Sequence, residues 1–318
     1  SITKQLFYFG APMLKKKIDG ITFPNPVGLA AGFDYDADLT SILPAVGFGF
    51  MTVGTVTLNE YEGNPLPRLS RLPNSRSLLI NKGFKSKGSE SVIDKLGSKK
   101  FAIPVGISVG STNRAFKSLA AQIEDIISTF SLFEASKVKH AYYELNISCP
   151  NTKGGQPFTT QDRLKMLLIA LDAVHISRPV YLKMPIDLSD EDSLKLLRCA
   201  ENHSVQGVVF GNLTKDKENP DITEADRMTW RNKPGNLSGK PTWHRSNSLI
   251  ALTKQHFDTR FTIIGTGGIF SPEDAQVKLA LGADMVQLIT GMIYRGPQLI
   301  GEINSLLASA KAIHADGA

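Results

Sequence analysis

The sequence predicts an α/β protein of the (β/α)8 barrel class, also called a TIM barrel. Short apolar segments rich in β-branched residues alternate with helix-period segments along almost the whole chain. Eight such strand–helix pairs can be counted, and 318 residues are enough for a barrel of this kind. Because periodicity alone does not show closure, a doubly wound sheet is the alternative. We expect one domain spanning residues 1–318.

The predicted strands are short apolar runs, and in chain order they are Val27–Ala31, Phe50–Thr55, Ile103–Val109, Tyr142–Ile147, Val180–Met184, Gly207–Phe210, Thr262–Gly265 and Met285–Ile289. The amphipathic helices predicted after them are Asp36–Leu43, Lys87–Leu96, Ala115–Phe130, Gln161–Val174, Asp190–His203, Ser246–Phe257, Pro272–Leu281 and Pro297–Ala312. Ser271 is a predicted N-cap, because Pro272 follows it at the first helical position.

Three further segments complete the predicted architecture. Lys17–Thr22 holds an Asp-Gly turn between strand-forming residues, which predicts a hairpin that caps the bottom of the barrel. The connections Val56–Lys85, after the second strand, and Asn212–Arg245, after the sixth, are too long for simple turns. Both leave the C-terminal ends of strands, where barrel enzymes build their active sites.

Composition excludes several classes of protein. The chain is 42% hydrophobic and 21% charged, which is typical of a globular protein and not of a disordered or collagen-like one. Two cysteines give no disulfide framework, which indicates a reducing compartment, and the six histidines show no metal-ligand spacing. No apolar run approaches the roughly 20 residues of a transmembrane helix. The net charge of +6 is spread along the chain, which argues against a nucleic-acid-binding module.

Candidate functional residues are the polar and glycine residues at the predicted strand ends. They are Gly28–Asp34 after the first strand, Asn146–Thr152 after the fourth, Lys183 in the fifth, Asn212 and Thr214 after the sixth, Gly265–Gly268 after the seventh, and Thr290 and Gly291 after the eighth. Glycines after the seventh and eighth strands let backbone N–H groups face an anion, which predicts a phosphorylated ligand over the top of the barrel. A tight strand-to-helix turn is the alternative reading of these glycines.

Two residues in this set predict chemistry. A charge in a buried parallel strand is costly without a partner, so Lys183 is expected to have a functional role. A free cysteine is usually a small buried hydrophobe, but Cys149 lies among polar residues at a strand end. Cys199 falls within a helical stretch and is expected to be structural.

Several blocks in order resemble the dihydroorotate dehydrogenase family. They are Asn25–Asp34, Glu62–Arg68, Asn146–Thr152, Gly235–Gly239 and Val286–Gly291, and the resemblance runs from about Ile18 to the last helix. It implies an FMN-containing barrel that oxidises (S)-dihydroorotate to orotate in pyrimidine biosynthesis. FMN supplies the hydride acceptor in such an enzyme, and the protein supplies a base.

The resemblance also implies a role for each matched residue. Cys149 would be the base, and Lys183 would stabilise negative charge on the flavin. The implied substrate-binding residues are Asn81, Asn146, Asn151, Asn212 and Thr214. The implied cofactor-binding residues are Ala30, Ala31, Gly32, Thr55, Ser108, Asn146, Lys183, Gly211, Ser238, Gly239, Gly267, Gly268, Thr290 and Gly291. No metal is implied.

The blocks mix two subclasses of the family. A cysteine base resembles the soluble class 1 enzymes, whereas Gly28–Asp34, Gly235–Gly239 and Met292–Pro297 resemble the membrane-associated, quinone-using class 2 enzymes. Quinone is therefore the expected electron acceptor, with fumarate or NAD as alternatives. Residues 1–17 are expected to be the remnant of a membrane-facing segment, on a cytoplasmic protein with peripheral membrane contact.

The chain also departs from the family pattern. Tyr35 and Gly54 stand where class 2 and class 1 enzymes place a lysine, and Lys82 or Lys85 is expected to substitute for it. Gly211 and Ser108 stand where threonine and asparagine are expected. An FMN enzyme acting on another reduced pyrimidine, or a non-redox barrel that binds a phosphorylated metabolite, are the alternative functions.

Overall fold

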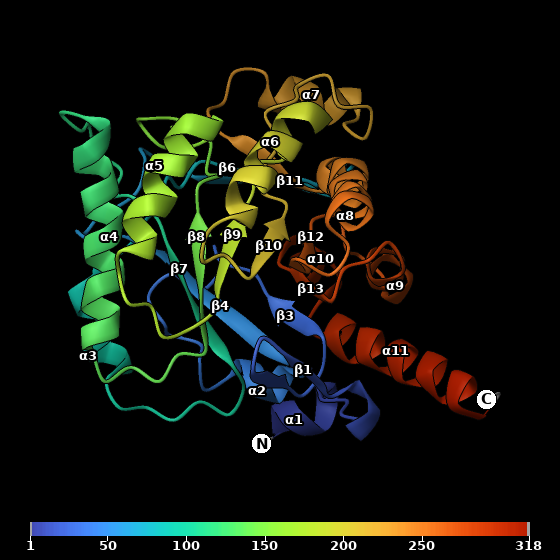
Figure 1. Ribbon diagram of the computed structural model, residues 1–318. Coiled ribbons are helices and arrows are strands. Elements are labelled where there is room, and N and C mark those ends of the chain that lie inside the picture. Colours follow the sequence, from blue (N-terminus) through green and yellow to red (C-terminus); the bar gives the residue numbers. More distant parts are fainter. Residues whose placement is uncertain (1, 317–318) are drawn as a thin grey trace.

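The protein is a closed barrel of eight parallel strands in a computed structural model that describes residues 2–316 (Figure 1). The barrel strands are β3 (Val27–Leu29), β4 (Phe50–Val56), β7 (Val105–Val109), β8 (Tyr142–Asn146), β9 (Val180–Lys183), β10 (Gly207–Phe210), β12 (Thr262–Thr266) and β13 (Met285–Leu288). They pair in chain order, and β13 pairs with β3 to close the sheet. The predicted barrel is confirmed, and each of its strands overlaps a predicted one.

The outer layer consists of helices that follow the strands. They are α2 (Leu43–Val46), α3 (Ser89–Leu96), α4 (Leu119–Ala135), α5 (Gln161–Asp172), α6 (Asp190–Glu201), α8 (Trp243–Phe257), α9 (Pro272–Ala280), α10 (Thr290–Arg295) and α11 (Gln298–Asp316). The predicted N-cap of α9 is present, because the Ser271 side chain and Asp274 form a reciprocal capping box. The core lies between strands and helices, where residues such as Leu182, Val208 and Ile250 are fully buried.

One predicted helix is wrong. The segment predicted as Asp36–Leu43 forms turns, and only the short α2 follows it. The Asp34 carboxylate accepts hydrogen bonds from the backbone N–H groups of Asp38 and Leu39 at 2.8 and 3.0 Å. Ala37 also has a φ of 60°, outside the helical region. An aspartate that bonds to nearby backbone competes with a helix, and it prevails here.

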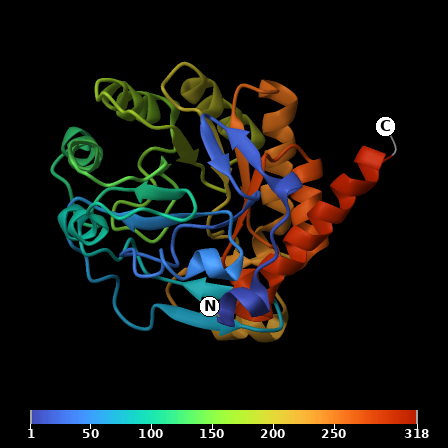
Figure 2. The ribbon, with the colours of Figure 1, turned by 90° about the horizontal axis from the view of Figure 1, so that it is seen from below.

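A hairpin closes the bottom of the barrel, as predicted (Figure 2). It consists of β1 (Lys16–Ile18) and β2 (Ile21–Phe23), joined by the Asp19–Gly20 turn. The Asp19 carboxylate accepts hydrogen bonds from the Tyr181 and Thr262 hydroxyls, at the lower ends of β9 and β12. Phe23 packs edge-on against Phe50 inside the lower barrel, with ring centroids 5.3 Å apart.

The two long connections form one roof above the opposite end of the barrel. The first contributes β5 (Leu69–Leu72) and β6 (Ser77–Ile80), and the second contributes α7 (Glu224–Trp230), β11 (Asn236–Gly239) and the 3₁₀ turn η2 (Lys240–Thr242). Strands β11, β6 and β5 form a three-stranded antiparallel sheet, in which Gly239 pairs with Ser77. Segments far apart in sequence therefore cover the C-terminal ends of the strands together (Figure 1).

The N-terminal segment lies beside the C-terminal helix. It contains α1 (Ile2–Phe7) and the 3₁₀ turn η1 (Pro12–Leu14), and the Lys311 ammonium of α11 donates to the Met13 carbonyl at 2.9 Å. Ile2, Leu6 and Met13 are exposed, Ile2 by 75%. Within residues 2–316, no helix has the length and apolar character needed to cross a bilayer.

Candidate functional site

A cavity of about 970 Å³ lies between the C-terminal ends of the barrel strands and the roof. Its floor comes from seven of the barrel strands or the turns that follow them. Its upper wall comes from Ile80 and Lys82–Phe84, after β6, and from Ser238 and Gly239 of β11. A position at the top of a barrel is typical of small-molecule and cofactor sites.

Small residues form one wall of the cavity. Gly267, Gly268, Thr290 and Gly291 line it at the ends of β12 and β13, and Ala30, Ala31 and Gly32 line it after β3. A Cβ at Gly291 would overlap the Ile269 carbonyl oxygen, and one at Gly268 would lie 2.6 Å from the Trp243 Cβ. The backbone at Gly268 and Gly291 therefore accepts only glycine, and the small residues of this wall let a ligand approach it closely.

The Cys149 thiol lies at the cavity and is half-buried. Burial raises the pKa of this thiol to about 11, while a hydrogen bond from the Asn151 backbone N–H and the positive charge of Lys183 act in the opposite direction. Two groups that stabilise a thiolate are thus already in place. Cys149 and Lys183 line the same cavity, because they lie at the C-terminal ends of the neighbouring strands β8 and β9.

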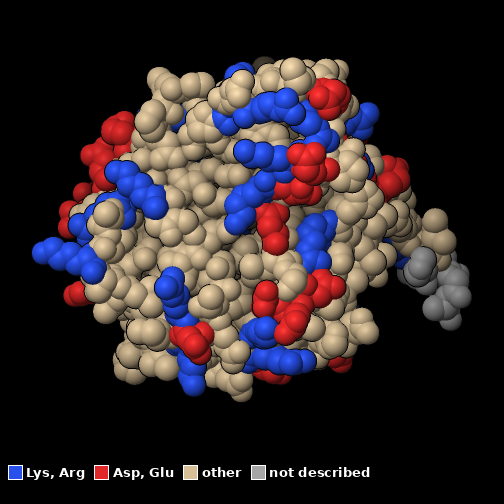
Figure 3. Space-filling view, turned by 90° about the horizontal axis from the view of Figure 1, so that it is seen from above, with Lys and Arg blue, Asp and Glu red and all other residues tan. Residues whose placement is uncertain are grey.

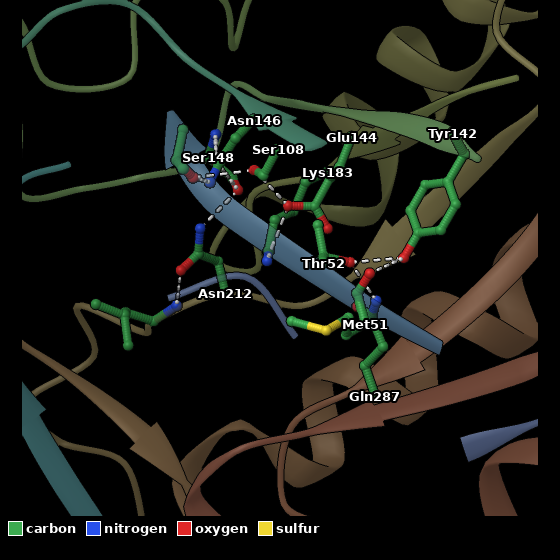
Figure 4. Close-up of polar contacts among 12 residues, drawn as sticks. Met51, Thr52, Ser108, Tyr142, Glu144, Asn146, Ser148, Lys183, Asn212 and Gln287 are labelled. Carbon is green, nitrogen blue, oxygen red and sulfur yellow. Dashed lines mark hydrogen bonds and ion pairs between the residues drawn. The ribbon is translucent and has the colours of Figure 1, made fainter. Parts of the chain in front are cut away.

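Lys183 has a buried partner inside the barrel. Its ammonium lies 3.3 Å from Oε1 of Glu144, and the two side chains are 5% and 1% exposed (Figure 4). Both residues point into the barrel from neighbouring strands, where Lys183 pairs with Asn146 and Glu144 with Tyr181. A buried lysine needs such a counter-charge, and Glu144 supplies it. Glu144 is not among the residues predicted from the sequence, although it is a charge in a buried strand just as Lys183 is.

A chain of side-chain hydrogen bonds leads from the cavity to the Glu144 carboxylate (Figure 4). In order, the chain runs through Asn212, Ser148, Asn146, Thr55 and Ser108, with donor–acceptor distances of 2.7, 3.1, 2.9, 3.0 and finally 2.8 Å to Glu144. Because Ser108 donates to the carboxylate, its oxygen must accept from Thr55, which in turn accepts from the Asn146 amide. Each residue in the chain therefore donates its hydrogen bond to the next one in the direction of Glu144.

A group of asparagines fastens the roof to the cavity. Asn151 lines the cavity, donates to the Ile80 carbonyl at 2.9 Å and accepts from the Asn236 amide at 2.6 Å. The Asn64 amide donates to the Asn81 side-chain oxygen at 2.9 Å. Asn64 and Asn236 belong to conspicuous sequence blocks, but the sequence did not show that they meet.

Three predicted site residues do not line the cavity. Asn81 lies behind its wall, bonded to Asn64. Thr214 is held by the Asp187 carboxylate at 2.6 Å and pairs with Leu237 of the roof. Ser108 is fully buried beneath it. The other predicted residues line the cavity, namely Cys149, Lys183, Asn146, Asn151, Asn212, Ala30, Ala31, Gly32, Thr55, Gly211, Ser238, Gly239, Gly267, Gly268, Thr290 and Gly291.

Lys82 and Tyr35 also line the cavity. The Lys82 ammonium lies 4.5 Å from the centroid of the Tyr35 ring, within range of a cation–π interaction. On the outer surface above, Lys and Arg side chains are interspersed with Asp and Glu, so no field of a single sign covers this face (Figure 3).

Known proteins resemble the chain over nearly its full length. The dihydroorotate dehydrogenase family model matches residues 13–310. A dihydroorotate dehydrogenase (quinone) of Thermosynechococcus vestitus is 36% identical over 96% of this chain and 84% of its own length. One of the same name from Christiangramia forsetii is 37% identical, over 96% and 87%.

Solved structures agree with the sequence comparisons. The dihydroorotate dehydrogenase of Eimeria tenella in complex with ferulenol superposes with a TM-score of 0.84 at 25% identity, over 99% of this chain and 89% of that one. Its ligand-free form gives 0.85 at 26% identity, over 96% and 91%. By the extent of these matches and by its barrel and roof, the chain belongs to the dihydroorotate dehydrogenase family.

Proposed function

We propose that this chain oxidises (S)-dihydroorotate to orotate, using FMN as hydride acceptor, and passes the electrons to a quinone. The observation that carries the proposal is the meeting of Cys149 and Lys183 at one glycine-walled cavity. Family membership and relatives named for quinone support the substrate and the acceptor.

The cavity fits FMN in its position at the top of the barrel and in the chemistry of its wall. Gly267, Gly268, Thr290 and Gly291 would hold the phosphate, since their wall is backbone and has no side chain at the glycines. Ala30, Ala31 and Gly32 would face the flat ring, and polar contacts would come from Thr55, Asn146, Lys183, Gly211, Ser238 and Gly239. Ser108 lies beneath the cavity and would act only through its hydrogen bond with Thr55. When bound, FMN would supply the hydride acceptor and with it the redox chemistry.

The protein's own contribution is proton transfer and electrostatics. Cys149 would take the proton from the carbon next to the one that loses hydride. Lys183 holds a positive charge at the cavity floor, where it favours both a thiolate and an anionic ligand. Asn146, Asn151 and Asn212 present amides that match the edges of a pyrimidine ring. Asn81 and Thr214 lie outside the cavity wall, bonded to Asn64 and Asp187, and would act only indirectly.

A quinone is apolar and resides in membranes, so access to it requires membrane contact. The exposed apolar side chains of the N-terminal segment, Ile2, Leu6, Tyr8, Phe9 and Met13, support a peripheral contact there. We propose that this contact is on the cytoplasmic side of a membrane, because two cysteines without a disulfide framework fit a reducing compartment.

The proposal is tested by anaerobic reduction and reoxidation of the purified protein. We expect a yellow protein whose flavin band is bleached by dihydroorotate and restored fastest by a soluble quinone, with fumarate and NAD as the comparison acceptors. A protein that takes up no FMN would contradict the proposal. Bleaching by dihydrouracil but not by dihydroorotate would show that the substrate is another reduced pyrimidine.

A further inference from the structure

The cavity wall carries an uneven charge. Among the described residues that line it there are two lysines, Lys82 and Lys183, and no carboxylate. Lys183 is neutralised from below by Glu144. Within residues 2–316, no carboxylate oxygen lies within 4 Å of the Lys82 ammonium. Lys82 is therefore the uncompensated positive charge of this site.

The backbone holds Lys82 firmly in this place. Its carbonyl accepts from the Asn64 backbone N–H at 3.1 Å, and the next carbonyl, that of Gly83, accepts from the Asn113 amide at 2.9 Å. The side chain is half-buried, and its ammonium rests over the Tyr35 ring. A lysine so positioned loses part of its hydration without gaining a counter-ion, and an anionic ligand can supply one.

We propose that Lys82 binds the carboxylate of the pyrimidine substrate, and that the Tyr35 ring is the platform that orients its ammonium. This assignment rests on the proposed function. It makes Lys82 the residue that distinguishes an acid such as dihydroorotate from an uncharged dihydropyrimidine. Lys85 is three residues further along the same loop and does not line the cavity, so it does not contact the ligand.

The electrostatic surroundings make this contact dependent on pH. Burial lowers the pKa of Lys82 from its ordinary value, and the neighbouring charges of Lys85 and Arg68 lower it further. The Lys82 ammonium, and with it the affinity for a carboxylate, should therefore be lost at a lower pH than for a free lysine. Tyr35 and Cys149 are the other titratable groups on this side of the cavity, and Asp36, which does not line the cavity, acts on Tyr35 through its charge.

The test is equilibrium binding to the FMN-loaded protein, followed by the change in flavin absorbance. Orotate is the anionic probe and uracil, the same ring without a carboxylate, is the neutral one. In Lys82→Met we expect orotate to bind about ten- to a hundredfold more weakly, because a charge-assisted hydrogen bond is lost, while uracil binds as before. Lys82→Arg should retain orotate binding, and Lys85→Met should equal the wild type.

A pH series separates the charge of Lys82 from its bulk. Orotate affinity of the wild type should decline on the alkaline side of neutrality, and Lys82→Arg should shift this decline upward, since arginine keeps its charge. A decline that remains in Lys82→Arg belongs to other titrating groups, such as Cys149 or the ring N–H of orotate itself.

Three results would overturn the assignment. Equal orotate affinity in Lys82→Met and wild type would do so, as would an equal loss of uracil binding. A loss of FMN rather than of orotate would show that Lys82 binds the cofactor. If the wild type itself is not reduced by dihydroorotate, the proposed function fails and the assignment fails with it.

Discussion

The pKa of the Cys149 thiol leads to a prediction at the scale of a single residue. Burial raises it to about 11, so little thiolate exists at pH 7. In the proposed reaction the thiolate is the base, so the rate of anaerobic flavin reduction by dihydroorotate should rise with pH, up to about tenfold per pH unit below the pKa. Cys149→Ser should lower the rate about 10²–10⁴-fold at pH 7, measured by stopped-flow absorbance.

Cys199 offers the matched control for this experiment. It lies on α6, where its Sγ donates to the Gln161 carbonyl at 3.8 Å, and it does not line the cavity. Cys199→Ser should therefore reduce its flavin at the wild-type rate. A wild-type rate that does not vary between pH 7 and about pH 10, or an unaffected Cys149→Ser variant, would exclude the thiol as base.

Some functional residues of the site could be predicted from the sequence, and others could not. Lys183 and Cys149 could be identified because a charge in a buried strand and a thiol among polar residues are both unusual. Glu144 is just as unusual by that reasoning and went unrecognised. Its role depends on the neighbouring strand, which brings the Lys183 ammonium within 3.3 Å of its carboxylate. The separation of the two residues in the sequence does not reveal this distance.

At the scale of elements, the roof has a small core of its own. Leu237 of β11 is fully buried among Leu72, Leu79, Ile222 and Trp230, separate from the barrel core. Leu237→Ala should cost about 2–5 kcal/mol of the interactions that hold the roof closed. We expect faster amide hydrogen exchange in β5, β6 and β11 with unchanged protection of the barrel strands, because such a unit can open locally.

Leu69 provides the comparison on the same sheet. It lies on β5 and is 50% exposed, so Leu69→Ala should change stability by no more than about 0.5 kcal/mol. If Leu237→Ala instead accelerated exchange equally in the barrel strands, the roof and the barrel would open as one unit.

The roof also explains which elements the sequence could not predict. The two long connections were expected to be functional loops, but the pairing of β6 with β11 was not foreseen. These strands are four residues long and stand far apart in the chain, so no local pattern relates them. Likewise, the helix predicted at Asp36–Leu43 does not form, because the Asp34 carboxylate accepts hydrogen bonds from backbone N–H groups of this segment.

At the scale of the whole molecule, Lys278 should make stability depend on pH. It is fully buried on α9, and its ammonium donates to Ser246 at 2.9 Å and to Asn247 at 2.8 Å. Burial lowers its pKa from 10.5 to about 7, and the charge of Asp274 offsets only part of that effect. Between these values the unfolded chain binds more protons than the native protein, so stability rises with pH.

Urea unfolding of wild type and Lys278→Met measures this effect. The free energy of unfolding of wild type, minus that of the variant, should increase by up to about 1.4 kcal/mol per pH unit from pH 7 to about pH 10. Subtracting the variant removes the contributions of other titrating groups. A difference that stays constant over this range, or that falls, would contradict a depressed lysine pKa.

The sequence by itself determined the barrel, the order of its strands and the family. These features depend on local periodicity and on ordered motif blocks, both of which are written along the chain. Only the tertiary structure decided that Glu144 neutralises Lys183, that two distant loops form one roof, and that Lys82 rests on Tyr35 without a counter-ion. The physical reason is that contacts between side chains depend on their distance and burial in three dimensions. The spacing of residues along the sequence reveals neither quantity.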